Sequence, residues 1–185
     1  MGRIIQNNLV IPLPPKNQTE FFKRMRPSKT NPYGFMGKTE DWVGLLTSDE
    51  RERDRLRITC EQMASAIDTL FATDELLVNG NHIQRILYLT GEMCPWGDFC
   101  STALFDLTPK VTEILVCNKT APEAFQTHFR NGLLTPADYR MIVQNNWAII
   151  LSDLHPHLLR EHEFQEGKQT PYRIDPRKLK EYLGF

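Results

Sequence analysis

Two cysteines stand close together in a loop-like stretch of the sequence, residues 94–100, which also holds a tryptophan and an aspartate. Five residues separate Cys94 from Cys100, whereas redox pairs have two intervening residues and zinc-binding pairs have two to four. No further pair of cysteines or histidines at regular spacing completes a ligand set. We therefore expect ordinary thiols, a packed Trp96, and neither a metal nor any other cofactor.

Three histidines, His155, His157 and His162, cluster near the end of a predicted long helix. Pro156 disturbs the backbone between the first two, so we do not expect both rings to face one ligand. Cationic side chains suit the C-terminal end of a helix, where they complement the helix dipole. The histidines are therefore expected to serve the helix rather than a metal.

Three carboxylates, Asp98, Asp106 and Glu113, fall in the region predicted to form a sheet. Acids from neighbouring strands can hold Mg²⁺ for phosphoryl transfer. Two acids on the same face of one strand are two residues apart, but Asp106 and Glu113 are seven apart. The sequence also lacks the glycine-rich phosphate loops and the serine nucleophile motif, so we assign no catalytic residue.

The composition is that of a globular chain: 185 residues, 41% hydrophobic and 24% charged, with a net charge of −1. This balance excludes a disordered chain and a protein-wide basic field for nucleic acid. No apolar run is long enough for a membrane span, and the N-terminus lacks the apolar core of a signal peptide. We expect reduced thiols and a location in the cytoplasm or nucleus.

These side chains must be positioned by helices and strands. The order of helix and strand patterns along the sequence predicts an α+β fold, with a small sheet of about three strands packed by helices. Residues 1–40 are rich in proline and are expected to form an extended arm; residues 41–162 form one α+β domain, and residues 163–185 a tail with a short helix. The strands are expected at residues 85–90, 102–107 and 111–117.

Four helices are expected. The first begins at Thr47, with a capping box to Glu50, and carries an apolar stripe of Leu56, Cys60, Met63, Ile67, Leu70 and Phe71. A short helix follows Pro122. A long helix starts at Thr135 with the stripe Tyr139, Val143, Trp147, Ile150, Leu151 and Leu154. The last helix opens at Asp175 and closes at Gly184.

The arm carries apolar surface that must lie on the protein itself or on a partner. The residues expected to bind a protein partner are Leu9, Val10, Ile11, Leu13, Phe21, Phe22 and Tyr33. The basic residues that could meet RNA phosphates are Lys23, Arg24, Arg26, Arg51 and Arg53.

Residues 58–129 resemble the first lobe of the DZF family. Residues 66–70 resemble its first helix, Gly91 sits where the family turns from strand to helix, and residues 111–125 resemble its second strand and the helix after it. The resemblance implies a nucleotidyltransferase-like fold, usually inactive, that pairs as a heterodimer in nuclear complexes handling double-stranded RNA. An active transferase has Gly-Ser after the first strand and paired acids, whereas this chain has Gly91-Glu92 and an isolated Glu113.

These observations favour a non-enzymatic assembly subunit that engages a protein partner through its arm, within an RNA-associated complex. One alternative is an enzyme that transfers nucleotidyl or phosphoryl groups with Mg²⁺ and the clustered carboxylates. The other alternative is an RNA-binding module. No membrane association is expected.

Overall fold

The computed structural model describes residues 3–6, 9–12, 18–28, 34–88, 93–98, 110–132, 141–142 and 145–185. Its helices and strands, in chain order, are β1 (Arg3–Gln6), β2 (Leu9–Pro12), α1 (Gln18–Met25), α2 (Trp42–Leu56), α3 (Cys60–Ala72), β3 (Leu77–Val78), β4 (Asn81–Tyr88), β5 (Lys110–Cys117), α4 (Glu123–Arg130), β6 (Ala148–Ser152), α6 (His155–His162) and α7 (Pro176–Leu183).

The main sheet is antiparallel and has the strand order β3-β4-β5-β6. The predicted α+β class is confirmed, with four strands in the sheet rather than about three. The predicted strands at residues 85–90 and 111–117 correspond to β4 and β5, and the register between these two shifts at Ile86 and Leu87. The strand predicted at residues 102–107 lies outside the described residues.

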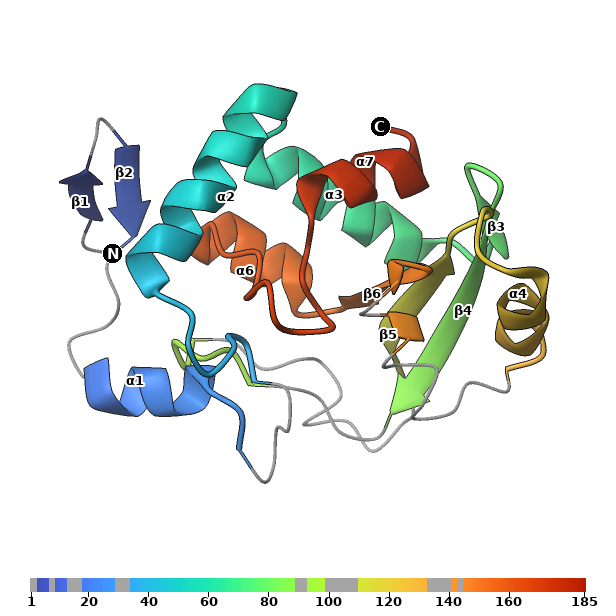
Figure 1. The fold of residues 1–185 in the computed structure, drawn as a ribbon, viewed down its shortest axis with the longest axis horizontal. Coiled ribbons are helices and arrows are strands. Elements are labelled where there is room, and N and C mark those ends of the chain that lie inside the picture. Colours follow the sequence, from blue (N-terminus) through green and yellow to red (C-terminus); the bar gives the residue numbers. More distant parts are fainter. Residues whose placement is uncertain are drawn as a thin grey trace.

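Both faces of this sheet are covered by helices (Figure 1). On β5, Ile114 and Val116 join a core cluster that includes residues of α3, α6 and α7. Leu115 and Cys117, which point to the other face because side chains alternate along a strand, pack with Phe125 and Phe129 of α4. The sheet therefore lies between two helical layers, and β5 is buried on both sides.

A second core cluster lies away from the sheet and joins α1, α2 and α6. Phe21 and Met25 of α1 pack there with Trp42 of α2, Leu158 of α6 and the side chain of Cys94. This cluster corrects the expectation that residues 1–40 form an extended arm. The helix α1 forms because Phe21 and Met25, one turn apart, bury one apolar face, and strands β1 and β2 pair antiparallel.

The helix predicted to begin at Thr47 is in fact two helices. Asp41 caps α2 by accepting a hydrogen bond from the Gly44 backbone, so the helix begins before Thr47. The chain then breaks at Arg57, whose φ of 55° is left-handed. Thr59 and Gln62 form the capping box that starts α3. The two helices share the predicted stripe across this break.

The predicted long helix over residues 135–154 is wrong at its C-terminal part. Residues Ala148–Ser152 form β6, and all five are buried. A short run of apolar residues buried on both faces fits a strand that is covered on both sides as well as a helix stripe, and β6 is such a strand at the edge of the sheet. Most of residues 135–147 lie outside the described part. Helices α4 and α7 occur where the sequence predicted them, the latter capped by Asp175 and closed at Gly184.

Among the described residues, no helix combines the length and apolar character that a membrane span requires.

Candidate metal centre

Four side chains from two separate parts of the chain converge on one point. They are Cys94 and Asp98 from the loop of residues 93–98, and His157 and His162 from helix α6. Their nearest ligand atoms, one sulfur, one carboxylate oxygen and two ring nitrogens, all lie within 4.8 Å of one another. The loop and the helix residues are 59 to 68 positions apart in sequence, so only the fold brings them together.

Four of the six distances among these atoms are close to the edges of a metal-centred tetrahedron. The two Nε2 atoms are 3.3 Å apart, and Oδ1 of Asp98 is 3.1 Å from Nε2 of His157. Sγ of Cys94 is 3.4 Å from Nε2 of His162. Zinc–ligand bonds imply edges of about 3.3 Å between nitrogen or oxygen atoms and about 3.6 Å between nitrogen and sulfur. These four distances have the spacing of zinc ligands, and the other two, from Cys94 to Asp98 and from Cys94 to His157, are at most 4.8 Å.

Hydrogen bonding alone cannot use all of these approaches. Nε2 of His162 has the Cys94 sulfur at 3.4 Å, the Asp98 Oδ1 at 3.3 Å and the His157 Nε2 at 3.3 Å. A ring nitrogen offers one hydrogen or one lone pair in the ring plane, so it can serve one of these neighbours. A cation at the common centre would take that one lone pair and a lone pair from each of the other three atoms.

The loop presents its two ligands through a tight turn. The Gly97 backbone donates a hydrogen bond of 2.8 Å to the carbonyl of Cys94, and Gly97 has a φ of 80°, which favours glycine. This turn places Cys94 inward, where it is buried, and leaves Asp98 about half exposed. The site therefore has a buried sulfur side and a carboxylate side that faces solvent.

Helix α6 presents the two histidines. Pro156 lies in its first turn, where the missing backbone N–H costs nothing, so the proline opens this helix rather than ending a longer one. Leu158 and Leu159 anchor the helix in two core clusters. His162 is buried in the last turn, and His157 is mostly covered.

His162 and Asp98 are in the protonation states that bind a divalent cation, whereas Cys94 would have to lose its proton on binding. Burial raises the pKa of Cys94 to about 12, and its hydrogen bond to Asp98 adds to this rise. Burial also lowers the pKa of His162, which favours the neutral imidazole that binds metals. Burial opposes ionisation of Asp98, but the Cys94 hydrogen bond and both histidines together keep its pKa below the usual value. A thiolate and a carboxylate would balance a dication.

The surroundings of His162 are aromatic. The Trp96 ring stacks on the His162 ring with centroids 3.8 Å apart and planes 4° apart. Among the described residues none accepts a hydrogen bond from Nδ1 of His162, although this atom is buried. Ligand histidines usually donate their second N–H, so stacking orients this ring where a hydrogen bond would be usual.

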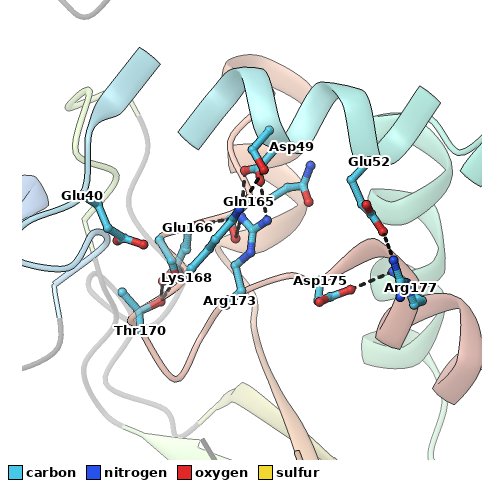
Figure 2. A network of polar contacts seen from close by, with 12 residues as sticks. Glu40, Asp49, Glu52, Gln165, Glu166, Lys168, Thr170, Arg173, Asp175 and Arg177 are labelled. Atoms are coloured by element: carbon cyan, nitrogen blue, oxygen red, sulfur yellow. Dashed lines mark hydrogen bonds and ion pairs between the residues drawn. The ribbon is translucent and has the colours of Figure 1, made fainter. Parts of the chain in front are cut away.

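A buried polar network joins α2, the start of α6 and residues 165–173, and part of it is shown in Figure 2. Arg173 makes a two-pronged ion pair with Asp49 of α2 and donates a hydrogen bond of 2.6 Å to the carbonyl of Glu166. Nδ1 of His155 accepts from the Ser152 backbone at 3.0 Å, so Nε2 carries the hydrogen and donates to Glu166, also at 3.0 Å. This network ties residues 165–173 to α2 and α6.

The pairs that stand out by spacing in the sequence are Cys94 with Cys100 and His155 with His157. The structure instead brings Cys94 and Asp98 to His157 and His162. Cys100 and Asp106 lie outside the described residues. Glu113 accepts a hydrogen bond of 2.7 Å from the Tyr172 hydroxyl and is not part of the converging group. The sequence signal for this site was two pairs of ligand-type residues at short spacing: Cys94 with Asp98 in a loop, and His157 with His162 in a helix.

The residues expected to bind a protein partner differ in where the structure places them. Phe21 is 1% exposed, so it belongs to the core, which corrects its assignment to a partner surface. Phe22 is partly buried against Trp42. Leu9, Val10 and Ile11 lie in β2. Leu13 and Tyr33 lie outside the described residues, and partner binding stays a prediction.

The basic residues expected to bind RNA also differ in their exposure and contacts. Arg53 is buried, which argues against its assignment to a phosphate contact. Arg26 donates to the carbonyls of Gly37 and Glu40. Arg24 donates to the Pro95 carbonyl at 3.2 Å. Lys23 and Arg51 are exposed.

The chain matches no protein-family model, and searches of curated proteins and of solved structures find no match either. The resemblance to the DZF family therefore stays a prediction.

Proposed function

We propose that this protein binds one zinc ion through Cys94, Asp98, His157 and His162, and that the ion fastens the loop of residues 93–98 to helix α6. The observation that carries the proposal is the convergence of four ligand atoms within 4.8 Å, three of which crowd Nε2 of His162. With four protein ligands the site is closed, which is typical of a structural rather than a catalytic zinc.

The chemistry of the ligand set favours zinc over magnesium. Thiolate and imidazole ligands in a tetrahedral arrangement suit zinc, while magnesium and calcium take oxygen ligands. Asp98, which the sequence grouped with acids for magnesium, lies with a sulfur and two nitrogens instead. This proposal departs from the expectation that the chain holds no metal. Assembly with a partner in the cytoplasm or nucleus stays a prediction beside it.

Metal content and metal spectra test the proposal. We expect about one zinc per chain after purification without chelator, and a tight site in competition with a chromophoric chelator. Cobalt substituted for zinc should give the intense visible bands of four-coordinate Co²⁺ and a sulfur-to-cobalt charge-transfer band. Cys94→Ser should remove that charge-transfer band, because the sulfur is gone.

Matched variants assign the ligands. His162→Gln and Asp98→Asn should lower zinc affinity by at least about tenfold, because each removes a ligand. His128→Gln is the control, since His128 is exposed on α4 and away from the site. Zinc content well below one per chain after reconstitution, or binding that none of the three ligand variants weakens, would refute the proposal.

A further inference from the structure

The loop of residues 93–98 faces the proposed zinc on one side and helix α1 on the other. Its outer residues Cys94 and Asp98 supply ligands, while Pro95 and Trp96 between them contact α1. The Pro95 carbonyl accepts a hydrogen bond of 3.2 Å from Arg24 of α1. The Trp96 ring meets Phe21 of α1 at 5.0 Å between centroids. The two ligands therefore flank the residues that contact α1 within one short turn.

Trp96 links the two sides directly. One face of its ring stacks on the ligand His162, and the ring also meets Phe21 edge-on. A shift of the loop that moves Cys94 or Asp98 must therefore move the surface on which Phe21 rests. Gly97 adds to this fit: a Cβ at Gly97 would lie 3.1 Å from Nη1 of Arg24.

Helix α1 depends on such contacts for its stability. It has 8 residues, and helices shorter than about 12–15 residues are marginal in water on their own. Its remaining neighbours in the described structure include Trp42, whose ring lies 5.4 Å from Phe21, and the backbone of Phe35, which donates to the Met25 carbonyl at 2.9 Å. Loss of the Trp96 contact would leave α1 packed against Trp42 and Phe35 without support from the loop.

From these contacts we infer that zinc binding docks helix α1: the ion holds the turn of residues 94–98, and the turn holds Phe21 and Arg24. The inference rests on the proposed zinc site. Without the ion, Cys94 and Asp98 are no longer tied to α6, and both ends of the turn lose their anchor. Helix α1 then loosens, and the buried faces of Phe21 and Met25 become exposed to solvent.

Hydrogen exchange on the full chain tests the inference without any mutation. Amide exchange of residues 18–28 should speed up by at least about tenfold when Zn²⁺ is removed with a chelator, and should recover when Zn²⁺ is returned. Helix α4, on the far face of the sheet, is the internal control and should change far less. Equal exchange of residues 18–28 with and without bound zinc would overturn the inference while leaving the zinc site intact.

Thermodynamic reciprocity supplies a second test. If zinc favours docked α1, then undocking α1 must weaken zinc binding by the same factor, commonly 5- to 150-fold for coupled sites. Phe21→Ala should therefore lower zinc affinity by at least about fivefold, although Phe21 belongs to no ligand pair. Phe129→Ala is the matched control, because Phe129 is equally buried but packs in the α4 cluster.

A milder pair of variants addresses the contact itself. Arg24→Gln should speed exchange of residues 18–28 in the zinc-loaded protein, because it weakens the link to Pro95, whereas Lys23→Gln at the exposed neighbouring position should not. Failure of the wild-type chain to bind zinc at all would refute the proposed function, and with it this inference. Normal zinc binding with equal affinities in Phe21→Ala and Phe129→Ala would refute the coupling alone.

Discussion

Helix α6 contributes residues to two polar clusters, which differ in whether each hydrogen-bond donor has its own acceptor. In the network around Arg173, each donor has an acceptor of its own: Arg173 meets Asp49 and backbone carbonyls, and His155 donates to Glu166. In the cluster around His162, three groups approach one nitrogen that can serve only one of them. The first arrangement is complete without a ligand, while in the second the crowding at Nε2 of His162 is what the proposed cation would resolve.

Burial and polarity alone therefore do not distinguish a structural network from a binding site. Both clusters include fully buried histidines, His155 and His162. The hydrogen count separates them: the network around Arg173 is satisfied, which rigidifies the fold, whereas the cluster around His162 brings more groups to one nitrogen than it can bond. The two clusters should therefore respond to different perturbations.

Deletion of residues 1–40 should have the largest effect. It removes Phe21, Met25, Phe35 and Met36, all of which are 5% exposed or less. At roughly 2–5 kcal/mol for each buried large side chain, the loss is comparable with the whole stability of a domain, about 5–15 kcal/mol. Thermal melts followed by circular dichroism should show loss of cooperative folding.

Deletion of residues 1–17, which spares α1, is the matched control for that experiment. It removes strands β1 and β2 and should leave the cooperative melt and the zinc content largely intact. A normal melt after deletion of residues 1–40 would show that the α1 cluster contributes little to folding.

Asp49→Ala should have the next largest effect and should spare the metal. It leaves Arg173 mostly buried without its carboxylate partner, a change that costs on the order of 3–5 kcal/mol. Urea unfolding measures the loss, and zinc content should stay the same.

Glu52→Ala is the control for the buried ion pair. Glu52 pairs with Arg177 and Arg55 near the surface, so its loss should cost less than about 1 kcal/mol. Equal losses for the two variants would mean that the Arg173 network is no more important than a surface pair.

Trp147→Ala should reduce stability by an intermediate amount and leave both polar clusters unchanged. The sequence predicted a fully buried Trp147 on a helix, with a cost of roughly 3–5 kcal/mol. The structure places it partly buried before β6, with its ring 5.2 Å from that of Phe125. We expect a loss of about 1–3 kcal/mol in urea unfolding, with unchanged zinc affinity. A loss above that range would restore the original prediction.

Glu166→Gln should have the smallest effect and should reveal itself through pH. Burial raises the pKa of Glu166 well above its usual value of 4.5, although Thr170 and Arg173 oppose the rise. The native state therefore keeps a proton that the unfolded chain has lost, so wild-type stability falls as pH rises above about 4.5. Glutamine keeps an acceptor for the Nε2–H of His155 and removes this titration.

Urea unfolding between about pH 4.5 and pH 8 checks this sign. The wild type should lose stability relative to Glu166→Gln as pH rises, and the variant should be at least as stable at neutral pH. The exposed Glu75 provides a control substitution, Glu75→Gln, which should keep the wild-type profile. A variant that is less stable than the wild type at every pH would mean that the Glu166 carboxylate is ionised and stabilising in the fold.

Local sequence signals predicted those elements whose ends carry a clear cap or turn. Helix α4 follows Pro122 and α7 begins at Pro176, both end within two residues of a glycine, and β5 is rich in β-branched residues. The run from Ala148 to Leu151 misled the prediction, because apolar residues buried on both faces of a sheet show no period. Helical spacing fitted part of the run by coincidence.

The site escaped prediction for a different reason. Local spacing rules test ligands that lie near one another in sequence, but this group joins a loop to a helix across β5, α4 and β6. Neither Cys94 with Asp98 nor His157 with His162 matches a zinc motif alone. Tertiary packing, including the stacking of Trp96 on His162, brings the two pairs together.

The distance along the chain between the loop and helix α6 has a consequence for the unfolded protein. Cys94 and His162 are 68 residues apart, and the segment between them contains β5, α4 and β6. A metal that joins these ends acts as a removable cross-link. By analogy with a disulfide, closing a loop of this size lowers the entropy of the unfolded chain by the equivalent of about 4 kcal/mol. The supply of zinc would then set how readily the central strands find one another, since loop closure is the slow part of pairing distant strands.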